Sequence, residues 1–348
     1  MNKNISTFIK ILSSLFLVEL VACASPAAPT ASLIPSLTAS AINISTVESS
    51  RSPTTLSPTS IIPPSNSVAT TPSPYYLPIV TASTTPQEFV FAVIGDYGGG
   101  GQPEADVADL VKSWNPDFIL TAGDNNYPSG AYETIDQNVG QFYQNFIYPY
   151  QGNYGDGATQ NRFFPTLGNH DWDTASAQPY LDYFTLPGNE RYYDLAWGPL
   201  HIYFIDSDSR EPDGVSSTSI QAGWLEQQLA ASTSPWDIVI FHHAPYSSGR
   251  HGSVDWMQWP FDQWGADFVI AGHDHTYERI AWDGIVYFVN GLGGGSKYDF
   301  HDIVPGSQIR YRDDYGAMRV EAGNKNIHFE FINRSKDVID EYIAEKPY

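Results

Sequence analysis

The stretch FVFAVIGDYG at residues 89–98 decides the fold, because a continuous apolar run rich in β-branched and aromatic residues ends abruptly at Gly95 and Asp96. Such a run is typical of a strand buried on both faces of a sheet. A helix is predicted over residues 103–114, and a second buried strand over residues 118–120 leads toward Asp124. Strand, helix and strand together predict a βαβ unit with parallel strands.

The same alternation recurs further along the chain. We expect strands at 200–205, 238–241 and 268–271, and helices at 220–230 and near 256–264. Four later apolar stretches, which we expect to be antiparallel strands, cover residues 285–289, 317–320, 327–332 and 338–343. The pattern predicts one α/β domain over residues 87–348, with two mixed β-sheets packed face to face and helices outside.

Polar residues fall at the ends of the predicted buried strands. Asp96, Asp124, His242 and His273 each come just after such a strand. Open α/β sheets bind ligands at the carboxyl ends of their strands. One aspartate in that place could simply end a strand in a turn, but four such residues predict a common site.

The residues around these positions form five short blocks. They are Gly95-Asp96-Tyr97-Gly98, Gly123-Asp124-Asn125-Asn126-Tyr127, Gly168-Asn169-His170-Asp171, Val239-Ile240-Phe241-His242 and Gly272-His273-Asp274-His275. In this order they resemble the signature of the purple acid phosphatases, of the small single-domain type, within the calcineurin-like metallophosphoesterase superfamily. The resemblance extends over nearly all of residues 87–348 and implies the calcineurin-like fold.

The resemblance implies a binuclear metal centre with seven ligands. Asp96, Tyr127 and His275 would hold one metal, Asn169, His242 and His273 the other, and Asp124 would bridge both. Carboxylate, phenolate, amide and imidazole donors suit a transition-metal pair. Iron(III) with divalent iron, zinc or manganese fits the family. The glycines at 95, 123, 168 and 272 are expected to let tight turns approach the metals.

The reaction implied is hydrolysis of phosphate monoesters by attack of a metal-bound hydroxide. His170 matches the family's general acid, and Asp171 is expected to orient it. His251 resembles a second histidine on the substrate side, and a surface-loop histidine is the alternative interpretation. For His243, an orienting or packing role competes with substrate contact.

The sequence is also compatible with two other functions. A phosphodiesterase or nucleotidase on the same fold, with manganese or zinc, is the alternative enzyme, and Tyr127 is the residue that separates it from a purple acid phosphatase. A non-catalytic cell-surface binding protein is the alternative of another class. The formal net charge of −22 disfavours binding to nucleic acid, so the expected partners are small phosphate esters.

The N-terminal part carries export signals. Residues 1–22 have a basic start and an apolar run, and the only cysteine of the chain, Cys23, follows in a lipobox-like sequence. We predict a lipoprotein signal peptide, lipidation at Cys23, and a Ser/Thr/Pro-rich linker over residues 23–86. The protein would face the periplasm or the cell exterior and touch a membrane only through this lipid. An ordinary signal peptide with full secretion and an uncleaved N-terminal helix are the alternatives.

Overall fold

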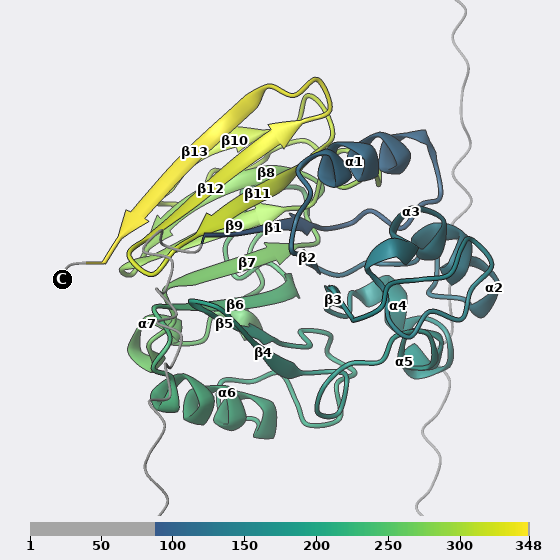
Figure 1. Ribbon diagram of the computed structural model, residues 1–348. Coiled ribbons are helices and arrows are strands. Elements are labelled where there is room, and N and C mark those ends of the chain that lie inside the picture. The colour runs from purple at the N-terminus through teal and green to yellow at the C-terminus, as the bar shows by residue number, and fades with distance from the viewer. Residues whose placement is uncertain (1–87, 347–348) are drawn as a thin grey trace, which may run out of the picture. The chain divides into compact units, whose positions relative to one another are not determined.

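The computed structural model describes residues 88–346 (Figure 1). The predicted signal peptide, Cys23 and the linker lie outside this range. Within it, no helix is long and apolar enough to cross a membrane.

The described part alternates strands and helices. The strands are β1 Phe89–Ile94, β2 Phe118–Thr121, β3 Phe163–Pro165, β4 Tyr193–Trp197, β5 Leu200–Phe204, β6 Trp236–His243, β7 Phe268–Gly272, β8 Tyr277–Trp282, β9 Ile285–Asn290, β10 Ser307–Tyr311, β11 Gly316–Ala322, β12 Asn326–Asn333 and β13 Val338–Glu345. The helices are α1 Gln102–Ser113, α2 Tyr132–Ile135, α3 Gln141–Tyr143, α4 Asn169–Trp172, α5 Gln178–Tyr183, α6 Ile220–Ala231 and α7 Phe261–Trp264.

The strands form two mixed sheets. The first sheet has the order β13-β12-β11-β1-β2-β3, and the second has the order β10-β8-β9-β7-β6-β5-β4. In the first sheet β1 pairs in parallel with β2 and β2 with β3, which confirms the predicted βαβ unit. In the second sheet β5, β6, β7 and β9 are parallel neighbours.

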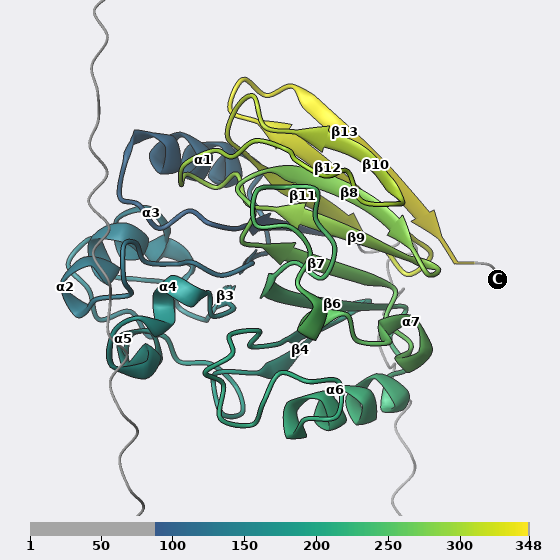
Figure 2. The same cartoon turned by 180° about the vertical axis from the view of Figure 1, so that it is seen from behind.

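The main hydrophobic core lies between the two sheets. Phe268 of β7 packs against Phe329 of β12 with ring centroids 4.7 Å apart, and Tyr277 of β8 stacks on Phe331 of β12 at 4.1 Å. A second core lies between the second sheet and helices α6 and α7, which cover its outer side in Figure 2. The predicted arrangement of two face-to-face sheets with helices outside is therefore confirmed.

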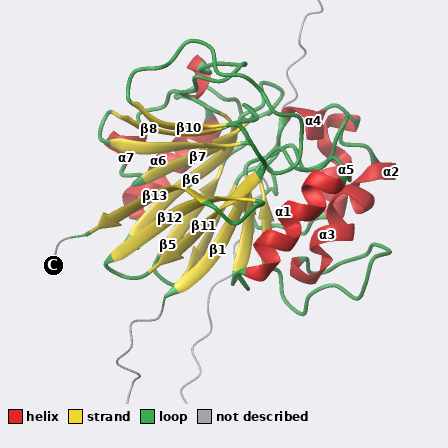
Figure 3. Cartoon of the chain, turned by 90° about the horizontal axis from the view of Figure 1, so that it is seen from above, coloured by secondary structure: helices red, strands yellow, loops and turns green. Residues whose placement is uncertain are grey.

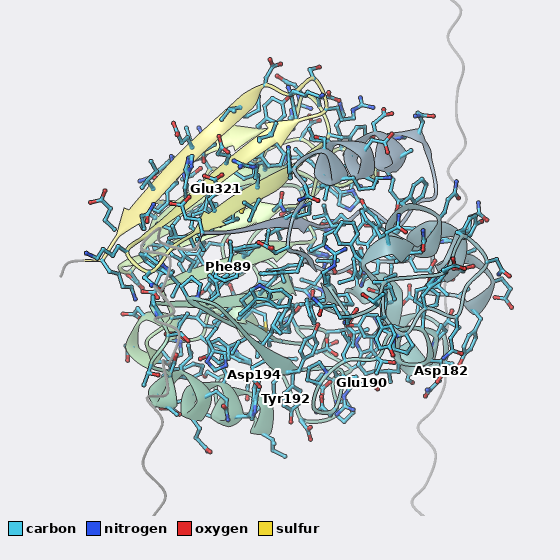
Figure 4. The ribbon with its side chains drawn as sticks, in the orientation of Figure 1. Phe89, Asp182, Glu190, Tyr192, Asp194 and Glu321 are labelled. Atoms are coloured by element: carbon cyan, nitrogen blue, oxygen red, sulfur yellow. The ribbon has the colours of Figure 1, made fainter. Side chains whose placement is uncertain are left out.

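The remaining helices gather beside the strand ends. Figure 3 shows α1 to α5 on one side of the strands. Strand β1 runs from Phe89 toward the side of the molecule where Asp182 of α5 lies, and both residues are labelled in Figure 4. The carboxyl ends of β1 and its parallel neighbours therefore open toward this helical part of the chain.

The sequence does not predict strands β3, β4, β8 and β10 or helices α2 to α5, and three further details differ from the prediction. Strand β9, expected to be antiparallel, pairs in parallel with β7 and antiparallel only with β8. The helix expected near 256–264 is a 3-10 turn, Asp255–Met257, followed by the short helix α7. Strand β6 extends through His243, so His242 lies inside the end of the strand.

Candidate metal centre

The strand ends of both sheets bring all seven predicted ligands together. The first sheet contributes the residues that follow β1, β2 and β3, and the second contributes the end of β6 and the residues after β7. They are Asp96, Asp124, Tyr127 and Asn169 from the first sheet, and His242, His273 and His275 from the second.

Three of these residues have unusual backbone angles, which direct their side chains into the site. Asp96 and Asp124 both have φ of 53°, and His273 has φ of 70°. Aspartate and histidine tolerate this left-handed region better than most residues, and such conformations often occur at functional sites. The main-chain N–H of Asp96 donates to the carbonyl of Gly123 at 3.1 Å, which joins the turns that follow β1 and β2.

Four side chains that can donate an electron pair to a metal converge on a point that we call the first position. The Tyr127 hydroxyl lies 2.9 Å from Asp124 Oδ2, 3.1 Å from His275 Nε2 and 3.4 Å from Asp96 Oδ1. His275 Nδ1 donates to the carbonyl of Ser296, so the lone pair of Nε2 faces the carboxylates. Ligand atoms of Asp96, Asp124 and His275 all lie within 4.8 Å of one another.

A second set of side chains that can donate an electron pair to a metal converges on a point that we call the second position. His242 Nε2 lies 3.1 Å from Asn169 Oδ1, 3.2 Å from His273 Nδ1 and 3.5 Å from Asp124 Oδ1. His242 Nδ1 donates to the carbonyl of Ala122 at 2.8 Å, which directs the lone pair of Nε2 into the site.

Asp124 lies between the two positions. Its Oδ2 contacts Tyr127 at the first position, while its Oδ1 faces His242 at the second. The main-chain N–H of His170 donates to Oδ1 at 3.0 Å and fixes the carboxylate. This is the arrangement required of a bridging ligand.

The chemistry of these groups fits metal ions. The carboxylate, amide and imidazole atoms that face one another in this buried space are mostly hydrogen-bond acceptors, with few hydrogen atoms among them. Burying such atoms together is favourable only when a cation lies among them. Burial lowers the pKa of His242 and His275, but the Asp96 and Asp124 carboxylates outweigh it and raise both pKa values. The same carboxylates would attract a metal cation.

Burial, with the nearby Asp124 and Asp96 carboxylates, also raises the pKa of the Tyr127 phenol well above its ordinary value. The phenol therefore keeps its proton at neutral pH unless a metal ion displaces it.

Two glycines allow the turns to approach this closely. A Cβ atom at Gly168 would lie 2.2 Å from Asp124 Oδ1. At Gly123, which has φ of 85°, it would lie 2.6 Å from His242 Nδ1. Both positions thus require glycine, as the sequence suggested.

His170 lies at the edge of the centre and is partly exposed. Its Nδ1 lies 2.5 Å from the carbonyl oxygen of Pro128, to which it donates. Its Nε2 faces the centre, 3.9 Å from Asp124 Oδ2. The ring also packs edge-on against Tyr127, with centroids 4.7 Å apart.

Asp171 does not orient His170, and that prediction is wrong. Its Oδ2 accepts hydrogen bonds from the N–H of Gly168 at 2.9 Å and from the side chain of Asn125 at 2.8 Å. The carboxyl group therefore caps α4 from inside the protein. Burial and the Asp124 carboxylate raise the pKa of Asp171 to about 7.

His243 and His251 both pack against His273, one of the predicted ligands. The His243 ring is buried 4.5 Å from that of His273, and its Nδ1 lies 2.9 Å from Ser207 Oγ. Burial and the neighbouring His242 lower the pKa of His243 to about 3, so the ring is neutral. The exposed His251 ring lies 4.2 Å from His273. His243 thus has packing contacts with the centre, and His251 lies at its solvent side.

The sequence does not predict that two further residues lie near the centre. Arg210, in the loop after β5, donates to the main-chain carbonyl of Asn169 at 2.8 Å. Tyr298, in the loop after β9, stacks flat on His275 with centroids 4.2 Å apart and an interplanar angle of 11°. Both lie in irregular loops outside the five blocks, so only the folded structure reveals them.

Comparison with known proteins agrees with this geometry. A model of the calcineurin-like phosphoesterase family matches residues 89–277. Purple acid phosphatase 17 of Arabidopsis thaliana is 24% identical over 299 residues, which cover 74% of this chain and 84% of that protein. Tartrate-resistant acid phosphatase type 5 of Rattus norvegicus is 25% identical over 309 residues, covering 74% of this chain and 91% of that protein.

A solved structure has the same fold. A purple acid phosphatase from seeds of yellow lupin (Lupinus luteus) superposes with a TM-score of 0.61 at 18% sequence identity. The match covers 76% of this chain and 55% of the lupin chain.

Proposed function

Since this chain belongs to the calcineurin-like phosphoesterase family, whose members include metal-dependent hydrolases, we propose that it is an acid phosphatase that hydrolyses phosphate monoesters at a pair of metal ions. The observation that carries the proposal is the position of Asp124, whose two carboxylate oxygens face two separate sets of donor atoms. A pair of bound metals would activate water and stabilise the charge of the phosphate group.

The protein residues would hold this pair in the way the sequence suggested. Asp96, Tyr127 and His275 suit the first position, and Asn169, His242 and His273 suit the second. The hydrogen bonds from His275 Nδ1 to Ser296 and from His242 Nδ1 to Ala122 leave the Nε2 atoms free for metals. Iron(III) at the first position is favoured by the phenol of Tyr127, a hard oxygen donor that the metal would deprotonate.

His170 would act as the general acid. Because Nδ1 donates to the carbonyl of Pro128, Nε2 is the atom that can carry a proton toward the ester. Transfer of that proton to the leaving oxygen is expected to contribute about two to four orders of magnitude in rate. His251, whose ring lies 4.2 Å from that of His273, would contact the phosphate or the leaving group.

The test is hydrolysis of 4-nitrophenyl phosphate by the purified metal-loaded protein, before and after treatment with a chelator. We expect activity that chelation abolishes and metal restores, with about two metal ions per chain by mass spectrometry. Asp124→Asn should lower the metal content at both positions, whereas His328→Ala, which removes an imidazole on β12 whose Nε2 lies 3.0 Å from Glu341, serves as the control.

Other results would favour the alternatives. Faster cleavage of bis(4-nitrophenyl) phosphate than of the monoester, with manganese or zinc bound, would favour a phosphodiesterase. A protein that holds its metals but hydrolyses neither ester would favour a binding function.

A further inference from the structure

A pocket of about 190 Å³ lies between α2, α5 and the loop that precedes β3. Helices α2 and α5 lie side by side in Figures 1 and 2, and Figure 4 labels Asp182 on this side of the molecule. The aromatic and polar side chains of the lining are those of Tyr132, Tyr183, Asp136, Asp182, Gln151 and Asn153. None of them belongs to the metal centre described above, so the pocket is a separate feature.

The carboxylate of Asp136 fixes one part of the lining. Its Oδ1 accepts hydrogen bonds from the hydroxyl groups of Tyr150 at 2.6 Å and Tyr183 at 2.9 Å. Its Oδ2 accepts from the main-chain N–H of Asn153 at 2.8 Å and from the Asn153 side chain at 3.1 Å. A carboxylate has about four acceptor sites, so those of Asp136 are occupied and hold the loop with Asn153 against α5.

Two features of the backbone bring this loop and Asp136 together. Asp136 begins a π-helical turn, Asp136–Gly140, and such distortions of a helix often occur at functional sites. A Cβ atom at Gly152 would lie 1.9 Å from Asp136 Oδ1, so the loop can pass this closely only because residue 152 is glycine. The shape of the pocket therefore depends on a fixed backbone arrangement.

Tyr132 and Asp182 connect α2 to α5 at another part of the lining. The Tyr132 hydroxyl donates to Asp182 Oδ2 at 2.6 Å, and the Gln178 side chain donates to Oδ1 at 2.8 Å. Although its hydroxyl is fixed, Tyr132 is 48% exposed. Within residues 88–346 the exposed tyrosines are Tyr132, Tyr148 and Tyr154, all from this part of the chain. An exposed ring with a fixed hydroxyl offers a flat apolar face to a ligand.

Both carboxylates of the pocket carry a negative charge at neutral pH. Burial raises the pKa of Asp136, but the hydrogen bonds that it accepts, first that from Tyr150, outweigh burial and hold the pKa below its usual value. The hydrogen bond from Tyr132 likewise lowers the pKa of Asp182. Among the described residues that line the pocket, none is basic. A phosphate ester or another anion would be repelled, so the pocket is no second site for phosphate substrates.

The hydrogen-bonding groups of the lining suit hydroxyl groups. The side-chain amides of Gln151 and Asn153 can donate and accept, and Asp182, which accepts bonds from Tyr132 and Gln178, has about four acceptor sites. An ammonium ion needs acceptors alone, whereas sugar hydroxyls both donate and accept. The C–H groups on the face of a sugar ring can pack on a tyrosine ring. The volume is below the range of about 300–1,000 Å³ typical of larger ligands, which suits a single ring.

We propose that this pocket binds one residue of a neutral carbohydrate, such as a hexose unit of a polysaccharide. Tyr132 would provide the flat apolar face, and Gln151, Asn153 and Asp182 would bond the sugar hydroxyls. The site would add a carbohydrate-binding function to the chain, and it does not rest on the proposed phosphatase function.

Calorimetric titration of the purified full-length protein with the methyl glycosides of glucose, galactose and mannose tests binding. We expect at least one of them to bind with a Kd of about 1 mM, the affinity of a weakly held ligand of this size. Choline and methyl glucuronide are the cationic and anionic probes, and neither should bind. Absence of binding by all three glycosides, or binding of choline or the glucuronide at least as tight as theirs, would overturn the proposal.

Variants of the lining locate the binding. Tyr132→Ala should weaken it about two- to tenfold, the effect of one aromatic contact, and Gln151→Ala about two- to tenfold, the effect of one hydrogen bond. Tyr148→Ala is the matched control, because Tyr148 is 49% exposed in the same part of the chain but does not line the pocket. Equal losses in Tyr132→Ala and Tyr148→Ala, or unchanged affinity in both Tyr132→Ala and Gln151→Ala, would also overturn the proposal.

Hydrolysis of 4-nitrophenyl phosphate separates this inference from the proposed phosphatase function. Because the pocket shares no residue with the metal centre, we expect the rate to be unchanged in Tyr132→Ala and Gln151→Ala, which also shows that the variants fold. Cleavage of the ester without binding of any glycoside would refute the carbohydrate site alone. If no ester is cleaved, the phosphatase function fails, while the titration, with thermal melting as the check of folding, still decides whether the pocket binds sugar.

Discussion

The guanidinium group of Arg210 donates from Nη2 to the carbonyl oxygen of Asn169 at 2.8 Å. Its Nη1 donates to Asp173 Oδ1 at 2.9 Å, and its Nε to Asp208 Oδ1 at 2.7 Å. Asn169 begins α4 and Asp173 follows its end. Arg210 therefore fixes both ends of the short helix that carries His170 and Asn169, a proposed metal ligand.

Replacing Arg210 should loosen the second position without removing any ligand. We expect Arg210→Ala to lower metal affinity or kcat by about 10- to 100-fold, the usual effect of losing a group that orients a ligand. Metal content at limiting metal concentration and kcat should be measured together. Arg319→Ala, which breaks ion pairs on β11, is the matched control; an equal loss there would point to general destabilisation.

Replacing His170 should remove the proton donor but keep the metals. His170→Ala should lower kcat by about two to four orders of magnitude for alkyl phosphates. The loss should shrink for 4-nitrophenyl phosphate, whose leaving group needs little protonation. Equal losses on both esters would show that His170 positions the substrate instead.

Tyr127 should give the protein its colour. As a phenolate bound to iron(III), it would produce a visible charge-transfer band. Because burial and the carboxylates raise the pKa of the phenol, the metal-free protein should show neither this band nor tyrosinate absorption at neutral pH.

The corresponding variant, Tyr127→Phe, should lose the band and retain some hydrolysis, since Asp124 and the histidines remain. Absorption spectra and iron content of the wild type and variant provide the measurement. A wild-type protein that contains iron(III) but has no visible band would contradict the assignment of Tyr127 and favour the manganese or zinc phosphodiesterase.

Cys23 should carry the lipid that attaches the protein to a membrane. It is the only cysteine in the chain, so it has no disulfide partner within it. Cys23→Ser should move the protein from the membrane fraction to the soluble fraction and abolish incorporation of labelled fatty acid. Absence of label in the wild type would instead favour an ordinary signal peptide.

The strands that were predictable are those with continuous apolar runs. β1, β2, β6 and β7 are buried along nearly their whole length, and each contains an uninterrupted run of at least three apolar residues. β10 lies at a sheet edge and its residues alternate between partly buried and exposed, so no apolar run marks it. The parallel pairing of β9 with β7 was missed because pairing depends on where the intervening strand β8 folds.

The seven proposed metal ligands could be named from the sequence because their order along the chain matches a known signature, and the structure brings them together. The error at Asp171 has a simple geometric cause. His170 and Asp171 are consecutive residues of α4, and consecutive side chains of an α-helix point about 100° apart. When His170 faces the centre, Asp171 must face elsewhere, so adjacency in sequence gave the wrong contact.

Each metal position takes donors from both sheets, because His275 joins the residues that follow β1 and β2, and His242 and His273 join Asn169. Bound metals would therefore tie the two sheets together, and their binding free energy would add to the free energy of unfolding. A metal present at 100 times its dissociation constant would add about 2.7 kcal/mol. The melting temperature should thus rise with the logarithm of free metal concentration, and chelation should lower it even in a variant such as His170→Ala that has lost most of its activity.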